Sequence, residues 1–202
     1  MKYYYLVTSL PTLVLGETPP LTPEKFFFSC STVLASADLE ELDRINRGRT
    51  DESTRPFMIR WRDAETQLRN AVAAIRAQRR GVEVRPYLRE HKGFAVWIEK
   101  GVTDCFAKEN PWEREMALDR LRWRILDELG RTDPFGVGAV FAFALKLRSA
   151  WKWAGRDPDR GRQTLGRLFL APAGEAAARA MGSAAGESAP VEADEAVGVA
   201  DG

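Results

Sequence analysis

The segment that most constrains the fold is residues 133–153, DPFGVGAVFAFALKLRSAWKW. Its first half, residues 135–145, carries no charge, and a helix that is apolar on every side must be covered by other helices or by lipid. This run is eleven residues long, whereas a helix that spans a bilayer needs about 20. We therefore predict a buried helix over residues 134–153, with Asp133 as its N-cap and Pro134 as its first residue.

Three other segments begin with the same signal, a polar capping residue followed directly by proline. The caps are Thr22, Asn110 and Asp157, and proline suits the first helical position because its missing N–H is not needed there. Residues 56–80 repeat apolar side chains every three or four positions and end at Gly81, as one long amphipathic helix would. The sequence thus predicts an all-α fold, a single multi-helix domain around the buried apolar helix.

Two segments carry weaker signals. Residues 2–15 are rich in Tyr, Val, Leu and Thr, which favours a strand. The chain offers no clear partner strand, so an extended or briefly helical segment is equally consistent. Residues 93–107 are expected to be helical, although Gly101 and several β-branched residues lower the helix propensity.

Composition changes sharply after residue 170. Residues 171–202 consist mainly of Ala, Gly, Glu, Ser and Pro, and so little apolar surface cannot offset the entropy of ordering. Six carboxylates and one arginine give this stretch a net charge of about −5, so the rest of the chain carries about +6 of the total of +1. We predict a mildly basic helical domain over residues 1–170 and a disordered acidic Ala/Gly-rich tail over residues 171–202.

Residues suited to catalysis are scarce. His91 is the only histidine, which excludes a multi-histidine metal site within the chain, and it lies in a charged loop where we expect it to be solvated. Cys30 and Cys105 lie far apart among apolar neighbours, so we interpret them as reduced core thiols. No phosphate-binding loop and no G-x-S-x-G turn occurs. We expect a protein that is not an enzyme, with no catalytic, cofactor-binding or metal-binding residues and no cofactor.

The sequence also bears on where the protein acts. Lys2 precedes an apolar run, but Thr8 and Pro11 interrupt that run and no small-residue cleavage site follows, so we do not interpret it as a signal peptide. No segment is long and apolar enough to span a membrane. We expect a cytoplasmic protein that reaches the inner face of a membrane only through partners.

Arginine-rich helix faces are the remaining candidates for binding. Arginines cluster in residues 44–49, 76–80 and 120–124, where they would suit phosphates. Acids are interleaved through most of these segments, which is typical of a solvated face or a protein contact. Nucleic acid is therefore not the expected partner, and a helical regulatory or nucleic-acid-binding module is the alternative function.

Two sequence blocks resemble a known family. The N-terminal block, residues 2–27, and the C-terminal block, residues 145–169, are similar to uncharacterised bacterial proteins encoded with subunits of V/A-type ATPases (ATP synthases). The first resemblance rests on a Tyr-rich start, and the second on a helix that ends near an aromatic pair and is followed by D-x-x-x-G. The matching residues are Tyr3, Tyr4, Tyr5, Leu6, Val7, Ser9, Leu10 and Pro11, then Trp151, Trp153, Asp157 and Gly161.

A more distant similarity extends to the C subunit of those ATPases, called d in eukaryotes. That subunit is an all-α funnel that seats the central stalk on the membrane rotor ring, and it is considerably longer than this chain. The resemblance implies a non-catalytic helical subunit or accessory protein of a V/A-type ATPase. Its partners would be the central-stalk and membrane-ring subunits.

Partner-binding residues are expected where the buried helix turns into the segment that follows it. A short, charged corner joins the two, and its side chains can reach a partner. The alternative interpretation is that they serve only as caps and surface charge. The predicted contact residues are Lys152, Arg156, Asp157 and Arg160, with Trp153 partly exposed beside them.

Overall fold

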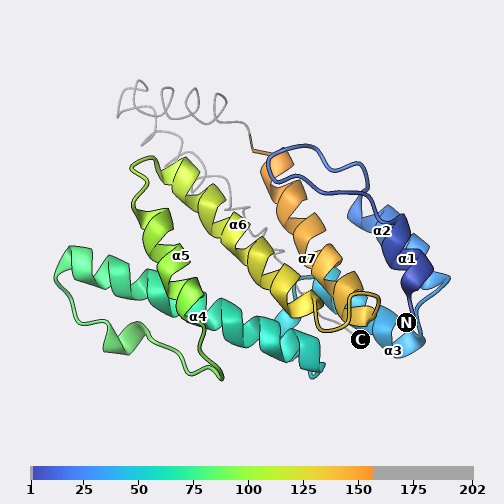
Figure 1. The fold of residues 1–202 in the computed structure, drawn as a ribbon, viewed down its shortest axis with the longest axis horizontal. Coiled ribbons are helices and arrows are strands. Elements are labelled where there is room, and N and C mark those ends of the chain that lie inside the picture. The colour runs from blue at the N-terminus through green and yellow to red at the C-terminus, as the bar shows by residue number, and fades with distance from the viewer. Residues whose placement is uncertain (1, 157–202) are drawn as a thin grey trace, which may run out of the picture. The chain divides into compact units, whose positions relative to one another are not determined.

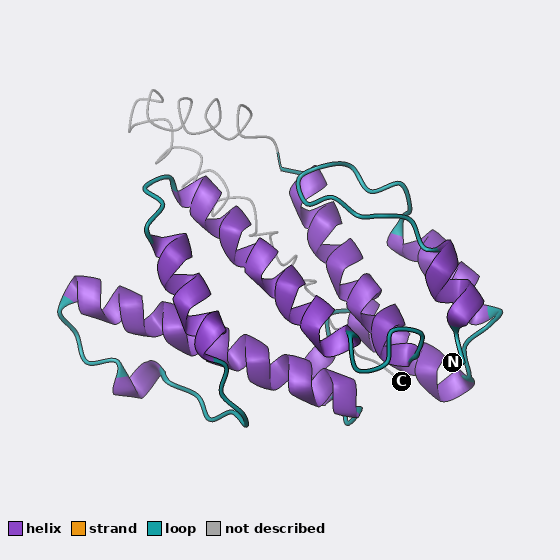
Figure 2. Cartoon of the chain, in the orientation of Figure 1, coloured by secondary structure: helices purple, strands orange, loops and turns teal. Residues whose placement is uncertain are grey.

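Helices account for all of the regular secondary structure in the part of the chain that the structure describes. The computed structural model describes residues 2–156, in which helices alternate with loops and no strand occurs (Figure 2). The all-α prediction is thus confirmed for these residues. The elements are α1 Tyr4–Ser9, α2 Pro23–Ser31, α3 Ser36–Asn46, the 3-10 helix η1 Thr50–Glu52, α4 Pro56–Arg80, the 3-10 helix η2 Arg85–Tyr87, α5 Val96–Phe106, α6 Pro111–Gly130 and α7 Val137–Ala154.

Several predicted helix ends are confirmed. The side-chain oxygen of Thr22 accepts a hydrogen bond from the backbone N–H of Lys25 at 3.3 Å. Asn110 Oδ1 accepts one from the N–H of Trp112 at 2.9 Å. Each bond satisfies a donor that the first turn of a helix leaves without a backbone partner. At the end of α4, Gly81 takes the left-handed conformation, with φ +66°, that glycine adopts without strain.

The predicted start of α7 is wrong by three residues. The helix begins at Val137 after Gly136, whose backbone is extended, and Asp133 makes no capping bond to it. A contact with the N-terminus explains the shift. The N–H of Tyr3 donates to the carbonyl oxygen of Phe135 at 3.0 Å, and this bond holds the chain in a turn ahead of the helix. Asp133 and Pro134 therefore belong to the connection between α6 and α7.

The two weakly predicted segments are both helical. Within residues 2–15 the chain forms only the six-residue α1, so the briefly helical alternative is the correct one. The helix expected over residues 93–107 is present as the shorter α5. Gly101 lies in the middle of α5, where a Cβ atom would lie 2.7 Å from a methyl carbon of Leu121. The glycine thus allows a close approach of α5 to α6.

The apolar helix α7 is buried as predicted, against α2, α3 and α6. Phe141 and Val140 of this helix are fully buried, and the ring centres of Phe143 and of Phe26 in α2 are 4.9 Å apart. A core cluster forms around these residues. It comprises Tyr3, Leu6, Phe26, Cys30, Leu34, Leu42, Ile45, Phe57, Met58, Leu126, Val140, Phe141, Ala142, Ala144 and Leu147.

A second core cluster contains no residue of α7, and the sequence did not predict this cluster. It is built where α4, α5 and α6 meet and includes the fully buried Leu68 and Val102. Trp61 and Leu129 pack against both clusters and join them. In Figure 1, α5, α6 and α7 run side by side, α4 crosses α5 and α6, and α1 to α3 lie on the other side of α7. The buried helix is therefore the centre of one half of this packing.

The predicted domain boundary is not reached by the described residues. Residues 157–202, which include the expected helix before residue 170 and the expected acidic tail, lie outside them. Within residues 2–156, no helix is long and apolar enough to cross a membrane.

Candidate partner-binding site

The predicted contact residues lie at the end of α7. Lys152 and Trp153 occupy the last turn of this helix, and Arg156 follows it directly. Asp157 and Arg160 lie outside the described residues. The structure therefore describes three of the five predicted contact residues.

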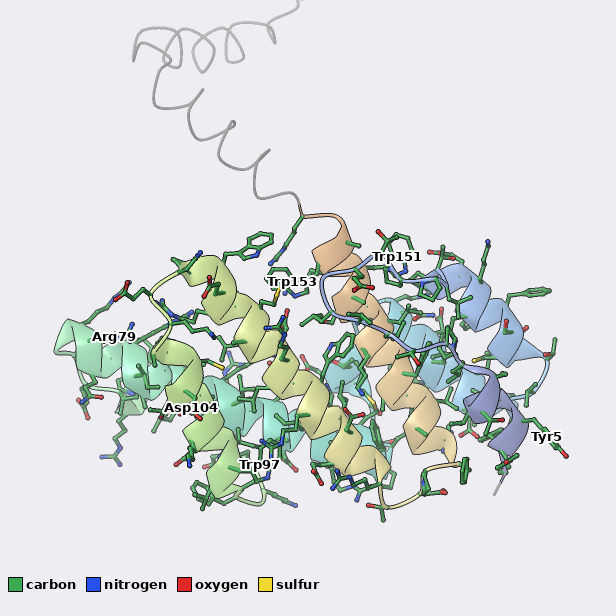
Figure 3. All side chains as sticks on the ribbon, turned by 45° about the horizontal axis from the view of Figure 1, so that its top comes forward. Tyr5, Arg79, Trp97, Asp104, Trp151 and Trp153 are labelled. Atoms are coloured by element: carbon green, nitrogen blue, oxygen red, sulfur yellow. The ribbon has the colours of Figure 1, made fainter. Side chains whose placement is uncertain are left out.

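Trp153 is buried, so the prediction of a partly exposed side chain is wrong. Only 3% of the residue is exposed. Its indole N–H donates a hydrogen bond of 2.6 Å to Asp119 Oδ2, and its ring meets that of Trp112 edge-on at 5.0 Å. Figure 3 shows Trp153 on the side of α7 that faces α6, and Trp151 on the opposite side. Trp153 therefore fastens α7 to α6.

Asp119 is the centre of a polar cluster that ties three helices together. It is buried in α6, and its other carboxylate oxygen accepts a bond of 2.8 Å from Arg122. Arg122 in turn donates to Glu65 of α4 at 2.9 Å. Burial alone would lower the pKa of Arg122, but the carboxylates of Glu65 and Asp119 raise it overall. Each buried charge is thus compensated by a partner.

Two cations project from this cluster to the surface. Lys152 is about half exposed, at 51% of its side chain, with its ammonium 3.5 Å from Asp119. The guanidinium of the exposed Arg156 lies over the ring of Trp153 at 4.7 Å, an arrangement stabilised by cation–π attraction. Two exposed positive charges therefore lie beside the buried hydrogen bond between Trp153 and Asp119.

The opposite side of α7 binds the N-terminal block and α3. The indole N–H of Trp151 donates to the backbone carbonyl of Leu21 at 2.9 Å. Arg148 donates to the carbonyl of Ile45 in α3, and burial lowers the pKa of its guanidinium. The two tryptophans of the C-terminal block thus have separate structural roles.

Most arginines on the predicted basic faces already have partners. Arg44 pairs with Glu41 at 3.0 Å, and Arg47 pairs with Asp43 at 2.8 Å. The guanidinium of Arg79 lies 5.1 Å from the ring centre of Phe106. The pairs with Glu41 and Asp43 reduce the positive charge available to phosphates, as the interleaved acids indicate.

The cysteines are buried and unpaired, as predicted. Neither Cys30 nor Cys105 forms a disulfide, and burial raises the pKa of Cys30 to about 12. Burial also raises the pKa of Cys105. Both thiols are therefore protonated at neutral pH. Among residues 2–156, no group of three or more His, Cys, Asp and Glu side chains is placed to hold a metal ion.

Sequence reasoning missed the polar cluster around Asp119. One of its contacts had a local signal, because Asp119 and Arg122 are three residues apart and share a helix face. The partners Glu65 and Trp153 are far away in the sequence, and only the packing of α4 and α7 on α6 brings them in.

Part of the chain matches the model of a known protein family. Residues 99–170 are similar to a family described as a protein of unknown function, DUF2764. This range contains α6, α7 and the whole C-terminal block. No curated protein and no solved structure matches the chain.

Proposed function

We propose that the protein is a non-catalytic helical subunit or accessory protein of a V/A-type ATPase. It couples the central stalk to the membrane rotor ring, in the manner of the C (d) subunit. Central-stalk subunits and the membrane ring are its partners, and it acts on the cytoplasmic side of the membrane.

The observation that carries this proposal is the contact between the two blocks of the resemblance. Tyr3 and Leu6 of the N-terminal block share a core cluster with Leu147 of the C-terminal block. The bond from Trp151 to Leu21 adds a polar contact between the same blocks. Segments more than 100 residues apart in the sequence thus form one structural unit, as expected if the resemblance reflects a shared architecture.

The end of α7 is the proposed contact surface. The buried bond between Trp153 and Asp119 fixes the helix end, and the exposed Lys152 and Arg156 stand on that rigid base. A coupling subunit transmits torque between its partners, so rigid anchoring of its contacts suits this role. The mildly basic charge of residues 1–170 is also compatible with a position near anionic lipid headgroups.

Affinity purification from the native host tests the proposal. We expect the tagged full-length protein to elute with central-stalk and ring subunits from gently solubilised membranes, identified by mass spectrometry. Elution without any ATPase subunit would refute the ATPase assignment.

Matched variants test the contact surface separately. K152Q/R156Q removes the two exposed charges and should reduce the recovery of the ATPase subunits. The control R47Q/R131Q removes two exposed charges elsewhere and should leave recovery unchanged. If K152Q/R156Q recovers as much of the ATPase subunits as R47Q/R131Q does, the contact lies at another surface.

The alternative function, nucleic-acid binding, has a different test. It predicts that the protein binds a duplex and that this binding weakens steeply as the salt concentration rises.

A further inference from the structure

A groove between α4 and α6 is not explained by the contacts described so far. It has a volume of about 480 Å³ and lies on the exposed side of the second core cluster. Its floor is apolar, formed by Val72, Ala73 and Ala77 of α4 and Leu118 of α6. Ala73 and Ala77 have small side chains, which occupy little of the space that the groove encloses.

Arginines form the rim of this groove. Arg76 pairs with Glu115 across it at 3.7 Å, but both side chains are about half exposed, and such surface pairs contribute little free energy. Arg80 lines the same rim and makes no ion pair within the described residues. Arg69 and Arg122 also line it while they bind Glu65. The outer end of the groove thus has an excess of positive charge.

Exposed apolar side chains extend the floor on one side. Tyr87 of η2 is 63% exposed and Val82 is 49% exposed, and both line the groove. Large apolar side chains that stay in water mark binding surfaces when they gather in one place. Tyrosine and arginine are also the residue types most enriched at the energetically important centres of protein interfaces. The composition of the groove therefore favours a protein partner.

The length of the groove sets the size of its occupant. Its α4 wall extends from Arg69 to Arg80, which corresponds to about 16 Å along a helix axis, or about three helical turns. A helix of that length presents apolar side chains at positions i, i+3 or i+4, and i+7 to such a groove. Acidic side chains beside this apolar stripe would then face Arg76 and Arg80.

We propose that the groove between α4 and α6 binds an amphipathic α-helix of a partner protein, with carboxylates flanking its apolar face. The apolar floor takes the anchoring side chains and the arginine rim takes the carboxylates. This proposal does not depend on the V/A-type ATPase assignment, since its contact residues Arg76 and Arg80 differ from Lys152 and Arg156 at the end of α7. Loss of either proposal leaves the other standing.

Synthetic helices test it on the full-length protein. The probes are a small panel of fluorescent, helix-stapled peptides of about three turns, with Leu anchors at i, i+3, i+7 or i, i+4, i+7 and Glu beside them. Control peptides carry Lys in place of Glu, or the same residues scrambled. We expect at least one Glu peptide to bind about tenfold more tightly than both of its controls, measured by fluorescence anisotropy. Failure of every Glu peptide to exceed its controls would overturn the proposal.

Variants connect that binding to the groove. R76E/R80E should weaken the Glu peptide about tenfold and strengthen the Lys peptide. A73W fills the floor and should abolish binding while the circular dichroism spectrum stays that of the wild type. R47E/R131E, a double charge reversal elsewhere, should bind like the wild type. Unchanged binding by R76E/R80E would overturn the proposal.

Two further outcomes would assign the groove to another occupant. Light scattering that shows a dimer of the wild type and a monomer of A73W would mean that a second copy of this chain fills it. Binding of single-stranded RNA that R76E/R80E abolishes, with no binding of the Glu peptides, would identify a nucleic-acid site. Either result would overturn the proposal.

Discussion

At the scale of single residues, burial of polar groups explains most of the long-range contacts. Asp119 accepts hydrogen bonds from Trp153 and Arg122, and Arg122 reaches Glu65. Removing one member of such a cluster leaves its partners buried without compensation, which costs more than the original pairing contributed. The cluster is therefore a sensitive test of the packing of α4, α6 and α7.

The substitution Asp119→Ala should lower the free energy of unfolding by about 3 kcal/mol, because it leaves the buried indole N–H of Trp153 without its acceptor and removes one of the two carboxylates that compensate Arg122. Urea unfolding followed by circular dichroism measures the change. As a control, Asp43→Ala removes an exposed pair with Arg47 and should cost less than about 1 kcal/mol. Equal losses in the two variants would contradict the structural role given to Asp119.

The buried thiol of Cys30 should make the free energy of unfolding depend on pH. Burial raises the pKa of its thiol from 9.0 to about 12. Above pH 9 the unfolded chain loses the thiol proton while the folded chain keeps it. The free energy of unfolding therefore falls as the pH rises from 9 toward 12. In urea unfolding at about pH 8 and about pH 10.5, Cys30→Ala should lose less stability between the two values than the wild type does. An identical loss in both proteins would contradict a buried thiol at position 30.

The sequence predicted the burial of the cysteines correctly but did not predict the burial of Trp153. Burial of the two cysteines followed from their apolar neighbours, and the structure confirms it. The burial of Trp153 could not be predicted, because its acceptor Asp119 lies 34 residues earlier in the chain. A tryptophan that follows a lysine near the charged end of a helix has the pattern of a partly exposed residue until its polar partner is known.

At the scale of elements, local signals predicted helices well and one helix start badly. Thr22 and Asn110 cap their helices because each cap needs only neighbouring residues. Asp133 has the same local signal, but the bond from Tyr3 to Phe135 holds its segment in a turn. A contact across more than 130 residues thus overrides a good capping sequence. Within residues 2–156, helices occur where the capping signals predicted them, and the start of α7 is the boundary that a distant contact changed.

Two glycines at different places in helices predict opposite effects of added side chains. A Cβ atom at Gly101 would lie 2.7 Å from Leu121, whereas at Gly130 nothing lies within 4 Å. Alanine has a helix propensity better than glycine by about 1 kcal/mol, but overpacking costs about 1–3 kcal/mol. Gly101→Ala should therefore destabilise the protein and Gly130→Ala should not, as measured by thermal unfolding. Stabilisation by Gly101→Ala would contradict the close approach of α5 to α6.

Side-chain amides of α4 hold the loop that follows it. Asn70 donates to the carbonyl of Arg89 at 2.7 Å and accepts from its N–H at 3.0 Å. Gln67 makes the same pair of bonds with Ala95. Asn70→Ala should therefore speed hydrogen exchange at the Arg89 amide, measured by mass spectrometry after proteolysis. Ser29→Ala, in the distant α2, is the control and should leave exchange there unchanged, and protection at Arg89 that survives Asn70→Ala would contradict this anchoring.

At the scale of the whole molecule, the described residues form two core clusters joined by Trp61 and Leu129. The sequence predicted the cluster around α7 because a continuous apolar run needs cover on all sides. It did not predict the cluster of α4, α5 and α6, since each of these amphipathic helices buries only one face and the sequence does not identify the partner of that face. The two proposed binding surfaces are the end of α7, with Lys152 and Arg156, and the groove between α4 and α6.

We propose that this helical protein couples the central stalk of a V/A-type ATPase to its membrane ring. The most direct test measures ATP hydrolysis and ion pumping together, in inverted membrane vesicles from the host with and without the gene. We expect vesicles that lack the protein to hydrolyse ATP but to pump fewer ions for each ATP, and we expect added wild-type protein to restore the ratio. An unchanged ratio of ions pumped to ATP hydrolysed without the protein would contradict it.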